Sequence, residues 1–201
     1  MKKKDLEIFL EKVPSFQQPS FELEQYKTPA VIAADMLFYA FINHDIEGKT
    51  VIDFGCGTGI FAVGATYLHA QKIYGFDIDK QCIRQAQTFA DNQALSIYYE
   101  SKDVKNISQK ADTAIMNPPF GAQKKNHHAD RIFLEKAIQL CSVVYSLHLE
   151  NTLPFIHQIT SALQASVEEI KTYQFPIKGS FYFHKKLVSS VPVIFLRIIK
   201  K

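Results

Sequence analysis

The spacing of hydrophobic residues changes repeatedly between two periods along the chain, and this change predicts strands and helices in turn. Short continuous apolar runs predict buried strands at residues 51–54, 73–76, 96–100, 111–116, 143–147, 167–175 and 191–199. Amphipathic stretches predict helices at residues 5–13, 30–42, 60–69, 80–92, 130–140 and 152–163. Thr28 and Pro29 fit the N-cap and the first position of the second helix.

The order of these elements predicts an α/β fold. Strands that alternate with helices pair in parallel, so we expect a mostly parallel seven-stranded sheet with helices on both faces. No helix separates 167–175 from 191–199, and these strands therefore predict an antiparallel C-terminal hairpin. The chain has no repeat, linker or low-complexity segment, and we expect one domain over residues 1–201.

Composition narrows the class of protein. Apolar residues make up 47% of the chain and charged residues 21%, which is typical of a globular domain. No apolar run approaches the ~20 residues of a membrane span, and the N-terminus lacks the apolar segment of a secretory signal. The 3 cysteines lie far apart, which indicates neither a disulfide framework nor a zinc site and favours a reducing, cytoplasmic setting. The net charge of +3 is too small to indicate a nucleic-acid partner by itself.

A glycine-rich turn at residues 55–59 follows the first predicted strand of the alternating region. At this point of a doubly wound sheet, strand ends and a helix N-terminus meet a ligand. The turn has the spacing G-x-G-x-G, whereas the dinucleotide fingerprint is G-x-G-x-x-G. Asp53, two residues before the first glycine, suits a positively charged cofactor. The pattern resembles the motif that binds S-adenosylmethionine.

Two further acids follow the next strands. Asp77 ends the second strand and could accept both ribose hydroxyls, and Asp103 follows the third and could meet the adenine amino group. The carboxyl ends of parallel strands share one edge of the sheet, so we expect these acids to lie together. The alternative is that they only cap helices and that the glycine turn is structural.

The sequence Asn117-Pro118-Pro119-Phe120 follows the strand at 111–116. Alone it indicates a turn, because proline fixes φ and asparagine often opens turns. At the edge of a cofactor crevice it resembles the [DNS]-P-P-[FYW] motif of Rossmann-like amino-methyltransferases. In that role the Asn117 side-chain oxygen and the Pro118 carbonyl would accept hydrogen bonds from a planar amine and draw it toward tetrahedral geometry. Phe120 could stack on the base.

This NPPF motif leaves the substrate open. Enzymes that share it methylate DNA adenine, RNA adenine, the 2-amino group of RNA guanine, or protein glutamine. The glutamine enzymes usually have tyrosine at the position of Phe120. No separate target-recognition domain is evident, which favours RNA over DNA. A non-catalytic RNA-binding protein of this fold remains an alternative, although it predicts decay of the acids or of the NPPF turn, and both are intact.

Five motifs in order resemble the small, single-domain methyltransferase-like proteins of archaea and eukaryotes. That family has a Rossmann-like methyltransferase fold and methylates N6 of an adenosine in small-subunit rRNA, giving N6-methyladenosine. Eukaryotic members work with a small zinc-binding activator protein. The motifs are L-E-Q-Y-K-T at 23–28, G-F-D-I-D at 75–79, I-M-N-P-P-F-G at 115–121, V-Y-S-L-H at 144–148 and F-H-K-K at 183–186.

Together, the glycine turn and the resemblance imply a set of S-adenosylmethionine-binding residues. In this interpretation the N-terminal helical segment, residues 1–45, covers the cofactor. The expected cofactor residues are Gln25, Tyr26, Thr28, Asp53, Gly55, Gly57, Thr58, Gly59, Ile60, Asp77, Ile78, Asp103 and Val104.

Two basic loops complete the expected site. The first, after the NPPF turn, contains Lys124 and Lys125, and the second lies between the last two strands. Aromatic and basic side chains of this kind suit a flipped or single-stranded base, although solvated loops have similar compositions. His127 and His128 lack ligand partners at suitable spacing, so we expect no metal. The candidate residues of the second loop are Tyr182, His184, Lys185 and Lys186.

Overall fold

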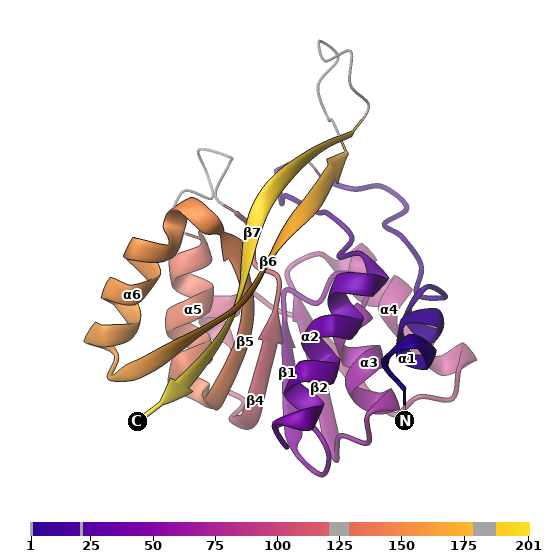
Figure 1. The fold of residues 1–201 in the computed structure, drawn as a ribbon. Coiled ribbons are helices and arrows are strands. Elements are labelled where there is room, and N and C mark those ends of the chain that lie inside the picture. Colours follow the sequence, from indigo (N-terminus) through magenta and orange to yellow (C-terminus); the bar gives the residue numbers. More distant parts are fainter. Residues whose placement is uncertain (1, 21, 121–128, 179–187) are drawn as a thin grey trace.

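The computed structural model describes residues 2–20, 22–120, 129–178 and 188–201. These residues form a sheet of 7 strands in the order β3-β2-β1-β4-β5-β7-β6 (Figure 1). Strands β1 to β5 are parallel, and β7 is antiparallel to both β5 and β6, which confirms the expected fold class and hairpin. The strands are β1 (Thr50–Phe54), β2 (Lys72–Asp77), β3 (Tyr98–Ser101), β4 (Ala111–Met116), β5 (Cys141–Leu149), β6 (Ala165–Lys178) and β7 (Val188–Lys200).

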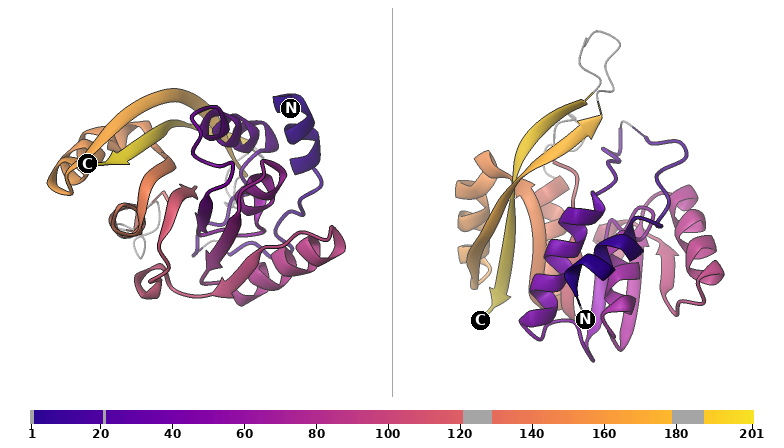
Figure 2. Two further views of the ribbon diagram at one scale, coloured as in Figure 1. Left: turned by 90° about the horizontal axis from the view of Figure 1, so that it is seen from below. Right: turned by 45° about the vertical axis from the view of Figure 1, so that its right-hand side comes forward.

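Helices cover both faces of the sheet and bury two apolar layers. Helices α1, α2 and α3 lie on one side, and α5 and α6 lie on the other (Figure 2). Met36 and Val63 belong to the first layer, whereas Leu134 and Ile156 belong to the second. The helices are α1 (Lys3–Leu10), α2 (Ala30–Ile42), α3 (Ile60–Tyr67), α4 (Lys80–Asn92), α5 (Ala129–Leu140) and α6 (Leu153–Ala162), with short 3-10 turns η1 (Val104–Asn106) and η3 (Glu150–Thr152).

Strand β1 lies at the centre of the sheet, and its sequence reflects burial on both sides. Val51 packs in the first apolar layer, whereas Ile52 and Phe54 pack in the second. A strand covered on both faces needs apolar side chains in both directions, which explains its continuous apolar run. Asp53 is the exception, since its carboxyl lies on the same buried face as Val51.

The order in which the chain adds strands to the sheet reverses at β1, between β1 and β4. From β1 the chain builds outward to β2 and β3, then returns to the other side of β1 as β4. Phe54 at the end of β1 pairs with Met116 at the end of β4. The glycine turn and the NPPF turn therefore leave the sheet side by side. Ligands of open α/β sheets bind outside the carboxyl ends of strands at such a switch point.

Several element boundaries and one helix cap differ from the sequence-based expectation. The N-cap of α2 is Pro29, whose carbonyl accepts from Ile32 and Ala33, so Thr28 does not cap the helix. Helix α1 begins and ends earlier than residues 5–13, and its end at Leu10 fits Pro14, whose ring would clash with the carbonyl four residues before it. Strands β6 and β7 are longer than expected and continue past the end of β5 as a two-stranded arm (Figure 1).

Candidate active site

The glycine turn has a backbone conformation that requires its glycines. Gly55, Gly57 and Gly59 have φ values of 67°, 53° and 89°, a region that other residues rarely adopt. The amides of Gly55 and Cys56 donate to the Phe76 carbonyl on β2, at 2.8 and 3.0 Å. These bonds anchor the turn to the neighbouring strand and bring its backbone to the sheet edge.

Asp77 holds the glycine turn from the end of β2. Its carboxylate accepts from the Gly57 amide at 2.8 Å and from the Asp79 amide at 2.9 Å, one bond on each oxygen. Burial raises the pKa of Asp77, and these backbone hydrogen bonds oppose that rise. Each carboxylate oxygen can accept a second bond, so Asp77 keeps acceptor capacity for a ligand.

Asp53 is buried beneath the same turn. Its Oδ2 accepts from the Ala62 amide of α3 at 3.0 Å, whereas Oδ1 has no partner among the described residues. Burial raises the pKa of Asp53 to about 8, and the nearby Asp77 carboxylate adds to the rise. Asp53 therefore bonds to the first turn of α3, as the helix-capping alternative expects, and its role toward a cofactor stays a prediction.

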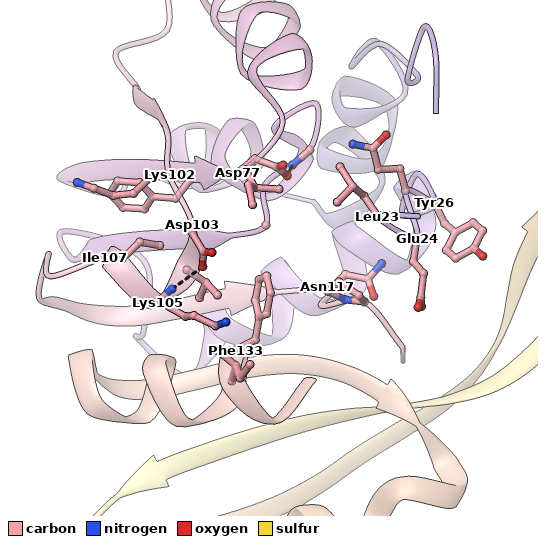
Figure 3. Close-up of a pocket in the computed structure, with 18 of the residues that line it drawn as sticks. Leu23, Glu24, Tyr26, Asp77, Lys102, Asp103, Lys105, Ile107, Asn117 and Phe133 are labelled. Atoms are coloured by element: carbon pink, nitrogen blue, oxygen red, sulfur yellow. Dashed lines mark hydrogen bonds between the residues drawn. The ribbon is translucent and has the colours of Figure 1, made fainter. Parts of the chain in front are cut away.

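A cavity of about 470 Å³ opens above these turns at the switch point (Figure 3). This volume is in the usual range for a small-molecule site. Its wall combines apolar side chains with Asp77, Asp103 and Asn117 (Figure 3). The lining residues are Phe16, Leu23, Glu24, Gln25, Tyr26, Gly55, Gly57, Phe76, Asp77, Ile78, Lys102, Asp103, Val104, Lys105, Ile107, Asn117, Pro119, Ile132 and Phe133.

The structure brings most of the expected cofactor residues to this wall and leaves others behind it. Thr58 and Ile60 are buried at the start of α3, and Gly59 is the N-cap of that helix. Asp53 lies under the turn, and Thr28 contacts Asn117 rather than the cavity. The expected cofactor residues that do line the cavity are Gln25, Tyr26, Gly55, Gly57, Asp77, Ile78, Asp103 and Val104.

Several lining residues were not among the expected ones. Phe16 lies over Gly57, and Phe133 of α5 lies beside Gly55, so both rings cover the turn. Lys102 and Lys105 flank Asp103 in the sequence, a neighbourhood that could have drawn attention to them. Nothing in the local sequence marks the aromatic residues, because their role depends on the docking of distant segments. The other unanticipated residues are Leu23, Glu24, Phe76, Ile107 and Ile132.

Asn117 presents an unpaired oxygen in the cavity wall. Its Nδ2 donates to Thr28 Oγ1 at 3.0 Å, and its buried Oδ1 has no hydrogen-bond partner within the described part of the chain. A buried carbonyl oxygen without a partner costs free energy, so the site has capacity for a ligand donor. Pro119 also lines the cavity, whereas Pro118 and Phe120 do not.

Phe120 packs into the protein instead of lining the cavity. The ring is 9% exposed and meets Phe175 of β6 edge to face, with centroids 5.6 Å apart. This contact connects the NPPF turn to the β6–β7 arm. The expected stacking of Phe120 on a substrate base is therefore not reproduced by the arrangement seen here, in which the ring fills the core.

The N-terminal segment is bonded to the β2–α4 connection. Gln25 Nε2 donates to Asp79 Oδ2 at 2.8 Å, and Gln25 Oε1 accepts from the Ser20 amide at 2.7 Å. Lys27 donates to the Val13 carbonyl at 2.6 Å. These bonds hold residues 23–26 as one wall of the cavity (Figure 3).

The remaining expectations concern basic loops and metals. Lys124, Lys125, Tyr182, His184, Lys185 and Lys186 lie outside the described residues. Among the residues that are described, His, Cys, Asp and Glu side chains form no group of 3 or more suited to a metal ion. Every helix in the same part of the chain is too short or too polar to span a bilayer.

Known proteins resemble this chain along its whole length. The rRNA N(6)-adenosine-methyltransferase METTL5 of Danio rerio is 38% identical over 205 residues, covering 98% of this chain and 98% of the relative. Mettl5 of Drosophila melanogaster, with the same enzyme name, is 36% identical over 208 residues, covering 98% and 96%. The crystal structure of a candidate RNA methyltransferase from Pyrococcus horikoshii has a TM-score of 0.91 and 35% identity, covering 100% and 98%.

A family model for the methyltransferase small domain matches residues 31–144, which include the glycine turn, Asp77, Asp103 and the NPPF turn. The fold, this match and the full-length relatives agree, and they confirm the resemblance seen in the sequence motifs. The chain therefore belongs to the methyltransferase small domain family, together with the METTL5 proteins that it matches from end to end.

Proposed function

We propose that this protein methylates the 6-amino group of an adenosine in structured RNA, in the small-subunit rRNA, with S-adenosylmethionine as the methyl donor. One observation carries the proposal: Asn117 holds a buried oxygen, without a hydrogen-bond partner among the described residues, in the wall of the cavity that the glycine turn also lines. The names of the full-length relatives support the choice of rRNA and of the adenosine N6 atom.

The residues of the cavity fit S-adenosylmethionine. The tight turn of Gly55 and Gly57 brings backbone close to the ligand, and Asp77 and Asp103 offer carboxylate oxygens for hydroxyl and amino groups. Asp53 lies beneath the turn and not in the cavity wall, and the positive charge of the cofactor would favour the ionised form of its carboxyl. When bound, S-adenosylmethionine supplies an electrophilic methyl group on a sulfonium centre, which becomes a neutral thioether on transfer.

Asn117 would activate the target amine from the other end of the cavity. The exocyclic nitrogen of adenine is a weak nucleophile because its lone pair is delocalised into the ring. Hydrogen bonds from the amine to Asn117 Oδ1 and the Pro118 carbonyl draw the nitrogen toward tetrahedral geometry and localise that pair. The rigid prolines hold both acceptors in place, so little reorganisation is needed.

The reaction needs no side-chain base. The amine would take the methyl group as the carbon–sulfur bond of the sulfonium breaks, and it would carry the positive charge after transfer. The methylated ammonium then loses one proton to water. Proximity and orientation at the cavity supply the main acceleration in this scheme.

The rest of the chain supports binding. In this proposal residues 1–201 act as one methyltransferase domain, and residues 1–45 close over the cofactor through Gln25 and Tyr26, which line the cavity. The two basic loops contact RNA, and the eukaryotic family suggests a zinc-binding activator as a second partner.

The decisive experiment is nucleoside mass spectrometry of rRNA from cells lacking this gene. We expect one N6-methyladenosine of the small-subunit rRNA to disappear and to return with the wild-type gene. Asn117→Ala should not restore it, although the purified variant should bind the cofactor with nearly unchanged affinity by calorimetry. Asp77→Ala should instead weaken cofactor binding.

An assay in vitro with the same proteins tests the alternative substrates, DNA adenine and protein glutamine. Wild-type protein is incubated with labelled S-adenosylmethionine and, separately, small ribosomal subunits from the deletion strain, genomic DNA or total protein. Label in the subunit RNA supports the proposal. Label that appears only in DNA or in protein glutamine overturns it, and so does full activity of Asn117→Ala.

A further inference from the structure

We propose that Thr28 is a positioning residue, which fixes the Asn117 amide so that its oxygen faces the amine that is methylated. The inference rests on the proposed function and assigns Thr28 a role different from the cofactor contact that the family resemblance implied. Thr28 is 5% exposed and does not line the cavity, but its Oγ1 accepts from Asn117 Nδ2 at 3.0 Å.

The orientation of the Asn117 amide decides whether the site can work. An asparagine amide has an acceptor at one end and a donor pair at the other. A target amine donates, so it needs the oxygen, and an amide turned by 180° would place two donor groups against each other. With Oδ1 toward the substrate, Nδ2 needs an acceptor in the protein, and Thr28 Oγ1 supplies it. Both ends of the amide are then satisfied only when the amine is in place.

The backbone around Thr28 is well suited to this role. The next residue is Pro29, whose φ is −57°, and proline restricts the residue before it to extended conformations. Three positions earlier, Gln25 bonds to Asp79 beside the cofactor end of the cavity. The segment from Gln25 to Thr28 therefore connects the cofactor end to the reaction end, although Thr28 and Asn117 lie 89 positions apart in the chain.

The test compares three variants. Thr28→Val keeps the shape of the side chain but removes the acceptor. Asn117 Nδ2 is then buried without this partner, and the amide changes its orientation. Thr28→Ser keeps the hydroxyl. Thr113→Val is the matched control, because Thr113 is a buried threonine on β4 whose hydroxyl donates to the Asp45 carbonyl, away from the cavity.

Methyl transfer to small subunits from the deletion strain is measured at saturating S-adenosylmethionine. We expect Thr28→Val to lower kcat about tenfold or more, since misplaced catalytic groups cost about that much. Its cofactor Kd should stay within about twofold of wild type, and Thr28→Ser and Thr113→Val should keep kcat within the same factor. Wild-type kcat in Thr28→Val overturns the inference. So does a loss confined to cofactor affinity, which would make Thr28 a cofactor contact.

A spectroscopic readout separates this inference from the proposed function. The Asn117 side-chain amide signal of ¹⁵N-labelled protein is assigned by its absence from Asn117→Ala. It should shift or broaden in Thr28→Val and stay in place in Thr28→Ser. An unchanged signal in Thr28→Val refutes the positioning role even if the enzyme is inactive on every substrate, whereas inactivity of wild-type protein on small subunits refutes only the proposed function.

Discussion

At the scale of single residues, Gly57 in the glycine turn and Asp53 beneath it each lower the stability of the folded protein. Gly57 has a positive φ, and a Cβ added there would lie 2.8 Å from the Phe16 ring. Asp53 is 1% exposed with one oxygen lacking a partner among described residues. Gly57 brings backbone to the cavity wall, whereas Asp53 supports the turn from below, and both features should be visible in stability measurements on the free protein.

Gly57→Ala should destabilise the protein more than Gly48→Ala. Both glycines have positive φ, which costs an L-residue about 1–2 kcal/mol, but no atom lies within 4 Å of a Cβ added at Gly48. The additional loss at Gly57, on the order of 1 kcal/mol, measures the displacement of Phe16. Urea unfolding of both variants gives the comparison. Equal losses would show that Phe16 moves aside without cost.

Asp53→Asn should change how stability depends on pH. The pKa of Asp53 is about 8 in the folded protein, above its ordinary value of 3.8, so the folded state binds more protons between these values. Its contribution is therefore fully present at low pH and is lost as pH rises toward 8. Relative to wild type, Asp53→Asn should be more stable at pH 8 than at pH 5, by at least ~1 kcal/mol. If urea unfolding gives the same difference in free energy between Asp53→Asn and wild type at both pH values, this prediction is wrong.

At the scale of elements, the β6–β7 arm is connected to the NPPF turn. Phe175 of β6 is fully buried and meets Phe120 edge to face. Aromatic pairs of this geometry prefer a defined arrangement, so the arm helps to hold the turn that carries Asn117. The arm is thus part of the scaffold that holds the NPPF turn.

Phe175→Leu should lower kcat, whereas Phe195→Leu should not. Phe195 of β7 is 1% exposed and meets Tyr39 edge to face at 5.8 Å, so its burial and ring contact match those of Phe175 away from the NPPF turn. Each variant should lose about 1–2 kcal/mol of stability. Only Phe175→Leu should reduce methyl transfer, by about tenfold. Equal kcat values at matched thermal stability would show that the turn is rigid without the arm.

At the scale of the whole molecule, charged residues connect the N-terminal helices to the C-terminal strands. Arg197 of β7 donates to Asp45 after α2 at 3.0 Å and to the Tyr145 hydroxyl at 2.9 Å, with little exposure of either ionic side chain. Asp35 of α2 pairs with Lys171 of β6 at 2.7 Å. The two contacts hold α2 against the strands that carry the arm.

Arg197→Met should destabilise the protein by about 3 kcal/mol, because it leaves the Asp45 carboxylate poorly solvated and without its cation. Lys171→Met is the matched control. The Lys171 side chain is 55% exposed, so its loss should cost less than about 1 kcal/mol. Denaturant unfolding distinguishes the two, and similar losses would mean that water screens the Arg197 pair as well.

Much of the fold was available in the sequence. Local periodicity identified every strand of the sheet, and the short apolar runs that end at Asp77 and Asn117 placed those residues at strand ends. The N-cap expected at Thr28 was wrong, since Pro29 takes that position, although the bounds of the helix were right. The bounds of β6 and β7 were wrong because their pairing with each other extends both strands beyond their local pattern. The proposed roles of the site residues stay predictions until the variants are measured.

The sequence by itself determined the alternation of elements, the glycine turn and the NPPF turn, because these depend on neighbouring residues and on the φ values that glycine and proline allow. Only the tertiary structure decided that Phe16 and Phe133 cover the glycine turn, that Phe120 faces Phe175, and that Thr28 bonds to Asn117. Each of these contacts joins segments far apart in the chain. Their geometry follows from how helices and strands pack on one sheet, which no local pattern encodes.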